Sequence, residues 1–233
     1  MWWFGAMHAN LLLAFRLAKG KDARRLLDAG CGTGGLLARI AAAYPERAPI
    51  GLDADHIACG RAAAKSGRPV CAGSVDALPF PDAAFGAIFS ADVLCHRNVR
   101  EREALAQFYR CLSDDGLLVL NLPTYRWMLS RHDTAVYNVR RYTRPGVVRL
   151  LQDAGFTILF ASYWNTLLFP LMVLTRKLLP GGDNASSDVK LYPAPVDAFC
   201  RAATGFERLL LRYRVHLPFG GSLIAVAAKQ PRA

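Results

Sequence analysis

Short hydrophobic runs alternate with longer stretches of helical character through the first half of the chain. The runs predict strands at residues 25–29, 49–53, 84–91 and 116–121, and the longer stretches predict helices at 36–44, 56–65 and 99–112. Strands that alternate with helices form a mainly parallel sheet, because each helix returns the chain to the edge where the next strand starts. The pattern therefore predicts an α/β fold with helices on both faces of the sheet.

The pattern changes after Pro123. Residues 124–144 are polar, basic and aromatic, with no clear period. Beyond them the sequence predicts a helix at 145–154, strands at 156–162 and 222–228, and a loop at 180–188. A proline at the first turn and a glycine just past the end support the predicted helix. A further helical face is marked by Phe206, Leu209, Leu210 and Tyr213, which recur at helical spacing.

A glycine-rich turn at residues 27–35, LDAGCGTGG, separates the first predicted strand from the first helix. Glycine permits close approach of a ligand and positive φ, and the following helix N-terminus offers free N–H groups. Gly30, Gly32 and Gly35 also fit the GxGxxG of dinucleotide binders, and Asp53 stands where a ribose-binding acid would lie. Asp28, two residues before the first glycine, distinguishes a second class of ligand. A carboxylate there suits a ligand with an ammonium group, which S-adenosylmethionine (SAM) carries.

With the later stretch at residues 73–82, GSVDALPFPD, and Phe85, this layout resembles the class I SAM-dependent methyltransferases of the UbiE-like, methyltransferase type 11 group. The resemblance covers residues 25–122. It implies a Rossmann-like, seven-stranded, mostly parallel sheet whose last strand is antiparallel, with helices on both faces and a basic and aromatic insert that covers the substrate. It also implies one domain over residues 1–233, with the substrate-covering inserts inside 124–215.

The resemblance implies SAM as the cofactor and assigns a role to each motif. The glycine loop holds the methionine part of SAM, the acid after the second strand binds the ribose hydroxyls, and the pair before Leu-Pro-Phe meets the adenine. Ser74 stands where the family has Asp, and Phe85-Gly86 stands where it has Phe-Asp. The predicted cofactor contacts are Asp28, Gly30, Cys31, Gly32, Gly34, Asp53, Ala54, Ser74, Val75 and Ser90.

Methyl transfer to an oxygen or nitrogen atom often needs a general base. The candidates for catalysis are His96, His132 and Asp133, with Asp92 beside them. Asp92 and His96 follow the strand predicted at 84–91, at the sheet edge where open α/β folds bind their ligands. His132 and Asp133 lie in the basic insert, which in this fold often covers the acceptor pocket.

The segment at residues 129–143 resembles a His-Asp…Arg-Arg-Tyr-Thr signature of a subgroup of these methyltransferases, although Asn138 stands where a second histidine is expected. Guanidinium groups match a phosphate or carboxylate, and an aromatic stretch at 163–170 could wall an apolar pocket. The predicted acceptor contacts are Tyr137, Arg140, Arg141, Tyr142 and Trp164.

The net charge of +11, with 53% hydrophobic residues, favours acidic partners. A basic insert beside the apolar stretch at 163–180 suits an amphiphile, so we expect a small-molecule or lipid-linked acceptor, with oxygen slightly favoured, and contact with a membrane surface. An RNA methyltransferase and a catalytically silent partner protein are the alternatives. Nucleic acid is disfavoured because the sequence holds no recognisable RNA- or DNA-binding module, and no metal is implied.

Two features bear on the compartment. The first twenty residues lack the basic start and cleavage site of a signal peptide, and the apolar stretch at 166–175 is shorter than the ~20 residues that span a bilayer. The six cysteines show no CxxC spacing, which predicts small buried side chains in a reducing compartment. We therefore expect a cytoplasmic protein.

Overall fold

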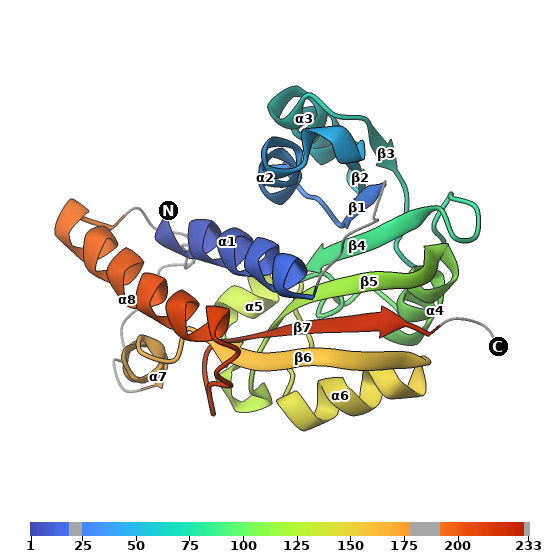
Figure 1. The fold of residues 1–233 in the computed structure, drawn as a ribbon. Coiled ribbons are helices and arrows are strands. Elements are labelled where there is room, and N and C mark those ends of the chain that lie inside the picture. Colours follow the sequence, from blue (N-terminus) through green and yellow to red (C-terminus); the bar gives the residue numbers. More distant parts are fainter. Residues whose placement is uncertain (19–24, 178–191, 231–233) are drawn as a thin grey trace.

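The structure is a computed structural model that describes residues 1–18, 25–177 and 192–230. Its strands form one seven-stranded sheet in the order β3-β2-β1-β4-β5-β7-β6 (Figure 1). The strands are β1 (Leu26–Ala29), β2 (Ile50–Asp53), β3 (Val70–Ala72), β4 (Phe85–Ala91), β5 (Leu112–Pro123), β6 (Phe156–Trp164) and β7 (Ser222–Lys229). Neighbouring strands from β3 to β5 are parallel, whereas β7 runs antiparallel to both β5 and β6. The predicted Rossmann-like sheet with an antiparallel last strand is confirmed.

Two layers of helices cover the sheet. The α-helices are α1 (Trp2–Leu17), α2 (Gly35–Ala43), α3 (His56–Ser66), α4 (Glu101–Cys111), α5 (Arg131–Ala135), α6 (Arg144–Asp153), α7 (Phe169–Lys177) and α8 (Ala194–Arg212), and short 3-10 turns lie at η1 (Pro45–Arg47) and η2 (Arg126–Met128). One buried cluster joins α1 and α2 to their face of the sheet, and a second joins α4 and α6 to the opposite face. Helix α8 lies against α1 (Figure 1), and its Leu211 belongs to the buried cluster on the α1 side of the sheet.

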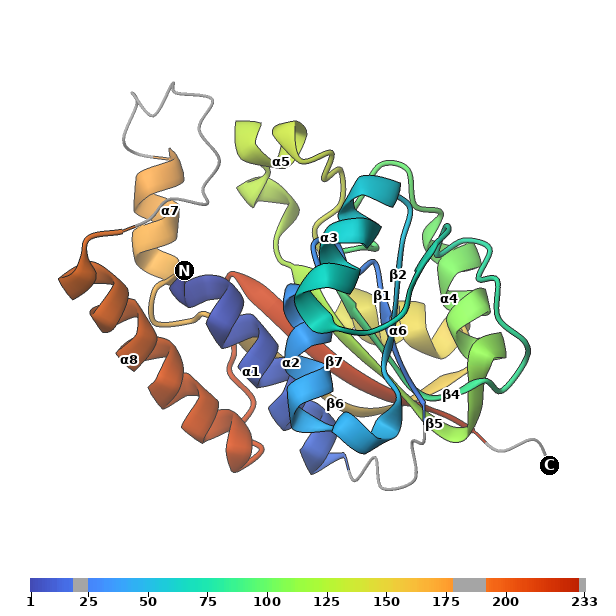
Figure 2. The ribbon, with the colours of Figure 1, turned by 90° about the horizontal axis from the view of Figure 1, so that it is seen from above.

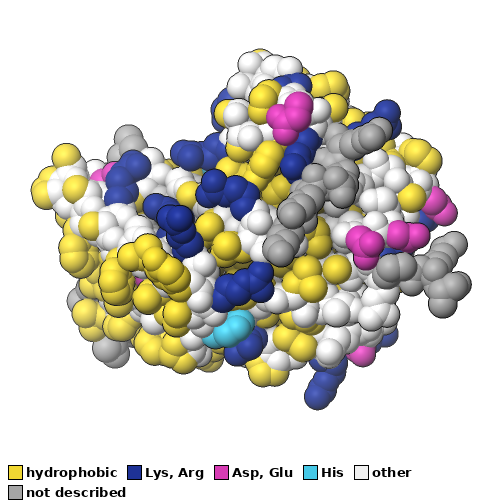
Figure 3. Space-filling model, viewed as in Figure 1, with side chains coloured by type: hydrophobic (Ala, Val, Ile, Leu, Met, Phe, Trp, Pro, Cys, Tyr) yellow, Lys and Arg dark blue, Asp and Glu magenta, His cyan; other side chains and the backbone are white. Residues whose placement is uncertain are grey.

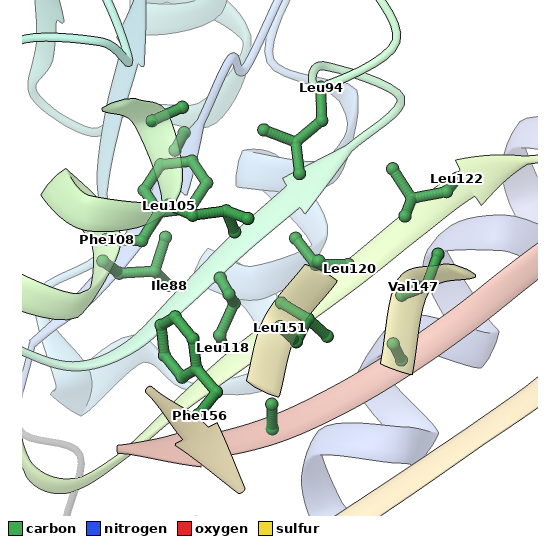
Figure 4. Close-up of a cluster of buried hydrophobic side chains, with 14 of the residues drawn as sticks. Ile88, Leu94, Leu105, Phe108, Leu118, Leu120, Leu122, Val147, Leu151 and Phe156 are labelled. Carbon is green, nitrogen blue, oxygen red and sulfur yellow. The ribbon is translucent and has the colours of Figure 1, made fainter. Parts of the chain in front are cut away.

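A buried hydrophobic cluster joins α4 and α6 to the central strands β4 and β5. Phe108 of α4 and Leu151 of α6 meet Ile88 and Leu118 of the two central strands in one buried cluster (Figure 4). Each of these side chains is fully buried, and burying one such side chain contributes about 1.5–3 kcal/mol. This cluster holds α4 and α6 against the two central strands.

The carboxyl ends of β5 and β6 meet the start of β7. Ser222 lies opposite Pro123 on one side and opposite Trp164 on the other. Parallel strands place their C-terminal loops at a common edge, so the loops after β1, β2, β4, β5 and β6 share one end of the sheet. Figure 2 shows α5 and α7 at this end.

Most predicted elements are present within one to four residues of their expected bounds. Strand β5 begins earlier than predicted, at Leu112, and the short β3 and the helix α1 were not predicted. The predicted helical face of Phe206, Leu209, Leu210 and Tyr213 lies on α8 and its C-cap. Leu210 packs partly against the core, whereas the other three side chains are exposed. The predicted loop at 180–188 lies outside the described residues.

The described cysteines are free, and all are buried except Cys71, which is half-buried. In the described part of the chain, we found no helix with both the length and the apolar character to cross a membrane.

Candidate functional site

The glycine loop between β1 and α2 has the backbone that its sequence predicts. Gly32 and Gly34 adopt φ of +51° and +79°, which glycine adopts without strain. A Cβ at Gly34 would lie 2.6 Å from the Ala62 Cα, so this glycine lets α2 approach α3. A Cβ at Gly32 would meet no described heavy atom within 4 Å other than those of its chain neighbours. Gly32 therefore faces open space into which a ligand can reach.

Asp53, at the end of β2, faces the same loop. Its Oδ2 accepts a hydrogen bond from the Gly32 N–H at 2.7 Å, and its Oδ1 accepts one from the Asp55 N–H at 3.0 Å. Asp55 in turn caps α3 by accepting from the Ile57 N–H. These bonds hold the carboxylate at the edge of the loop, where a ribose-binding acid is expected.

Asp28 is a buried carboxyl group below the glycine loop. Its pKa is raised to about 7, mainly by burial and also by the nearby Asp53 carboxylate, while a backbone hydrogen bond from Leu37 lowers it. Its Oδ2 has no hydrogen-bond partner among the described residues, although it is buried. An unpaired buried carboxylate is costly unless a cation or donor meets it. The ammonium group of SAM is such a partner, so the buried Asp28 carboxyl group fits SAM.

The remaining predicted cofactor residues surround this loop. Gly30 and Cys31 donate their N–H groups to the Leu52 carbonyl, which ties the loop to β2. Ser90 is buried on β4, and its hydroxyl has no partner in the described structure. Ala54 is exposed after β2, and Val75 is buried in the core cluster. The Ser74 hydroxyl accepts from the Asp76 N–H, so this serine forms a turn where the family has an acid.

Asp92 lies just past β4 in a strained backbone conformation, with φ of +56°. Its Oδ1 accepts a hydrogen bond from the Asn121 amide at 2.9 Å, and the Asn121 Oδ1 accepts one from the Trp164 indole at 2.8 Å. Burial raises the pKa of Asp92 to about 7, although the Asn121 bond lowers it. A carboxyl group with this pKa can take up a proton near neutral pH.

Asp133 and Arg141 form a buried ion pair inside the insert. The Arg141 Nη2 lies 2.8 Å from Oδ1 and 2.9 Å from Oδ2 of Asp133, and Ser130 also donates to the carboxylate. The Arg141 Nη1 donates to the Thr124 carbonyl. Both predicted site residues thus hold the insert to the end of β5, and their charges neutralise each other.

The other predicted acceptor residues have different surroundings. Arg140 donates to the carbonyls of Leu94 and His96, and the Tyr142 hydroxyl donates to the Leu94 carbonyl. Trp164 is fully buried, whereas Tyr137 is exposed. Arg140 and Tyr142 therefore shape the loop after β4, and Trp164 reaches the site through Asn121.

His96 lies in that same loop. Burial lowers its pKa, so the imidazole is neutral at physiological pH and can accept a proton. The side chain of His132 lies outside the described residues, so its role stays a prediction.

An aromatic cluster lies at the carboxyl ends of β5 and β6. The Tyr125 ring stacks on Trp127 and on Tyr163, with centroids 5.7 and 5.6 Å apart. Phe169 of α7 contacts Tyr125 and Phe219. Trp127 is 52% exposed, so the cluster presents an aromatic surface beside the Asp133–Arg141 pair. The aromatic stretch at 163–170 was expected to wall an apolar pocket. Tyr125 was not predicted there, although its position just after β5 places it at the ligand-binding end of the sheet.

Helix α1 carries two buried polar residues, His8 and Asn10, that were not predicted. His8 is buried beside the start of α2, since a Cβ added at Gly35 would lie 3.1 Å from the His8 Cε1. Burial lowers the pKa of His8 to about 4. Asn10 is buried, and its side-chain amide has no partner among the described residues. Polar residues within an otherwise apolar run were the only signal for these positions.

Comparisons with known proteins agree with this geometry. Residues 27–120 match a family model described as a methyltransferase domain. The malonyl-[acyl-carrier protein] O-methyltransferase of Geobacter sulfurreducens is 30% identical over 161 residues, which cover 62% of this chain and 60% of that protein. A 24-methylenesterol C-methyltransferase 2 of Oryza sativa subsp. japonica is 27% identical over 165 residues, which cover 61% of this chain and 44% of that protein.

Solved structures show the same fold. The YcgJ protein of Bacillus subtilis is 17% identical, with a TM-score of 0.63 over 97% of this chain and 100% of that chain. Geranyl diphosphate C-methyltransferase of Streptomyces coelicolor, solved with S-adenosyl-L-homocysteine, is 13% identical, with a TM-score of 0.56 over 89% of this chain and 71% of that chain.

Together the fold, the glycine loop and the family match define a methyltransferase domain. Residues 27–120 thus resemble the cofactor-binding part of class I SAM-dependent methyltransferases, and the buried Asp28, the glycine loop and Asp53 fit SAM as its cofactor. The match covers less than two thirds of the length of the curated relatives.

Proposed function

We propose that this protein transfers a methyl group from SAM to an amphiphilic small-molecule or lipid-linked acceptor, with an oxygen atom as the favoured acceptor. The observation that carries the proposal is the exposed aromatic cluster around Tyr125 and Trp127, which lies at the cofactor edge of the sheet. An apolar surface next to the methyl donor binds the hydrocarbon part of an acceptor.

SAM supplies an electrophilic methyl group when it is bound. The protein's part is to align the acceptor and to exclude water, because the sulfonium is already a good leaving group. Asp28, Gly32 and Asp53 would hold the cofactor. Its reactive end would then lie beside β4, near Ser90 and Asp92.

Asp92 and His96 are the proposed proton acceptors. Both groups follow β4. Burial raises the pKa of Asp92 to about 7, so this carboxyl group can take up a proton near neutral pH, whereas burial lowers the pKa of His96 and favours its neutral imidazole. Asn121 fixes the Asp92 carboxyl through the 2.9 Å hydrogen bond. Asp133 is a weaker candidate, because the Arg141 guanidinium occupies both of its oxygens.

The relatives support an acceptor that is carrier-linked or lipid-like. Their names specify a malonyl group on acyl-carrier protein and a sterol as acceptors. The net charge of +11 also suits an acceptor that carries a phosphate or carboxylate.

The test is transfer of radiolabelled methyl groups from SAM into a host-cell extract, followed by partition between organic and aqueous phases. Label that enters the organic phase is the expected result, and its loss on mild alkaline hydrolysis would identify the acceptor oxygen as part of a carboxylate. Label that stays aqueous and is released by ribonuclease would instead assign the protein to RNA methylation. Cofactor binding without any transfer would contradict the proposed activity and favour a silent partner protein.

A further inference from the structure

Helix α8 exposes an apolar face that the core does not use. Its buried positions, Cys200, Thr204, Glu207 and Leu211, recur at helical spacing and define the side that faces the protein. Phe199, Phe206 and Tyr213 follow one another at seven-residue intervals, so they share a different side. These three side chains are 63%, 55% and 74% exposed.

Neighbouring residues extend this face into a patch. Leu167, Leu171 and Leu174, on and just before α7, are also exposed. Figure 3 shows hydrophobic side chains gathered at the lower left of the view, over α7 and α8. Large exposed apolar patches mark interaction sites, because a monomer gains nothing from keeping them in water. We call these six residues the α7–α8 patch.

The opposite edge of α8 is basic. Arg201, Arg208 and Arg212 follow helical spacing, and Arg201 also pairs with Asp197. Ala198, Ala202 and Gly205 lie between the basic edge and the apolar edge. The exposed Leu209 lies in the same sector, so a surface that meets both edges of the helix also contacts this apolar side chain. Lys and Arg side chains lie next to the patch in Figure 3.

We propose that the α7–α8 patch and the basic edge of α8 dock on an anionic membrane surface. Aromatic and aliphatic side chains enter the boundary between headgroups and acyl chains, and the guanidinium groups bind lipid phosphates. The charge of the chain, +11 overall, is complementary to such a surface. A second copy of the chain fits less well, because two basic edges would be brought together.

The patch is also continuous with the acceptor side. Phe169 begins α7 and contacts Tyr125 of the aromatic cluster. A membrane at the α7–α8 patch would therefore lie next to the aromatic surface proposed to bind the acceptor. Docking goes beyond the proposed methyl transfer and does not rest on it, since it needs neither cofactor nor acceptor.

The experiment is co-sedimentation of the full chain with vesicles of phosphatidylcholine alone or of equal parts phosphatidylcholine and phosphatidylglycerol. The double variant Phe206→Glu/Tyr213→Glu removes the apolar face, and Arg212→Glu reverses one charge on the basic edge. Arg102→Glu on α4, exposed and away from the patch, is the matched control, because each of the three variants lowers the net charge by two units, from +11 to +9. Circular dichroism spectra confirm that each variant is folded.

We expect the wild type to sediment with the anionic vesicles and to be released by salt. The double variant and Arg212→Glu should each bind at least about tenfold more weakly, and Arg102→Glu should bind nearly as well as the wild type. Equal losses in all three variants, no sedimentation, or binding that ignores the anionic lipid would each overturn the proposal. A dimer in gel filtration that the double variant abolishes would assign the patch to self-association instead.

Discussion

The side-chain amide of Asn121 donates a hydrogen bond to the carboxyl group of Asp92 across the ends of β5 and β4, over 2.9 Å. The same amide accepts from the buried Trp164 indole through its oxygen. A residue held on both sides cannot rotate freely, so Asn121 sets the orientation of the carboxyl group that we propose as a base. This arrangement leads to the first prediction.

Asn121→Ala should move the pH profile of the reaction to higher pH. Burial raises the pKa of Asp92 to about 7, and the Asn121 bond lowers it. Removing the bond therefore raises the pKa further, and the rising limb of kcat/KM against pH should shift upward. Trp164→Phe breaks only the indole bond and should leave the limb nearly unmoved. An unchanged limb in Asn121→Ala would show that Asp92 is not the titrating base.

Asp92→Asn should lower kcat by roughly 10²–10⁴-fold, which is the usual contribution of a general base. The affinity for S-adenosylhomocysteine, measured by calorimetry, should stay within a few-fold of the wild type. If His96→Gln removes the activity and Asp92→Asn does not, the base is His96.

Asp28→Asn should stabilise the protein at pH 8 while it abolishes cofactor binding. The folded pKa of Asp28 is about 7, above its ordinary value of 3.8, so the folded state holds the proton more tightly than the unfolded state. Stability is therefore lost as the pH rises from about 4 to about 7, by an amount on the order of a few kcal/mol. The variant avoids this loss.

Melting temperatures at pH 5 and pH 8, with and without S-adenosylhomocysteine, measure both effects. The difference between Asp28→Asn and the wild type should be larger at pH 8, and the ligand should raise the melting temperature of the wild type alone. A variant that still responds to the ligand would exclude Asp28 from the cofactor site.

Arg141→Ala should cost about 3–5 kcal/mol of unfolding free energy, because it leaves the buried Asp133 carboxylate without its cation. The double variant Asp133→Ala/Arg141→Ala should be more stable than Arg141→Ala alone. Urea unfolding measures both. Additive losses in the two single variants would show that the two groups are not energetically coupled.

Gly32→Ala and Gly34→Ala form a matched pair at positions with positive φ. At Gly34 the added methyl group meets the backbone of α3 at Ala62, so this variant should be much less stable than the wild type. At Gly32 the methyl group enters open space, so stability should fall by only about 1 kcal/mol, while S-adenosylhomocysteine binds more weakly. Unchanged ligand affinity in Gly32→Ala would contradict a cofactor at this position.

Trp127→Ala should raise the KM for the acceptor several-fold and leave cofactor affinity unchanged, because the indole is exposed within the aromatic cluster. Leu159→Ala, which removes another exposed apolar side chain from β6, is the control. Equal effects of the two substitutions would mean that the cluster does not bind the acceptor.

The parts of the fold that the sequence predicted have strong local signals. The glycine loop and the strands β1, β2 and β4 are short apolar runs bounded by turn residues, and their backbone follows from that pattern. Strand β3 spans only Val70–Ala72 and has no such run. Helix α1 was not predicted, because its apolar residues were compared only with those of a signal peptide.

The site was harder to predict where contacts join distant segments. Asp133 and Arg141 are eight residues apart in a stretch without a period, so their pairing is a property of the folded insert. The link from Trp164 through Asn121 to Asp92 joins three strands and depends on sheet order. The apolar residues of α8 had the right spacing, but spacing alone does not distinguish a face that packs on the core from one that meets another surface.

The place of β7 in the sheet has a consequence for synthesis on the ribosome. Strand β7 is the last of the described strands to be made, yet it lies between β5 and β6 and completes the surface on which α1 packs. Until it emerges, the edge of β5 stays unpaired, and β6 has no neighbour to join. Helix α1 and strand β7 thus meet in one core although they are synthesised far apart in time, so a nascent chain must remain partly open, within reach of chaperones, until β7 has emerged from the ribosome.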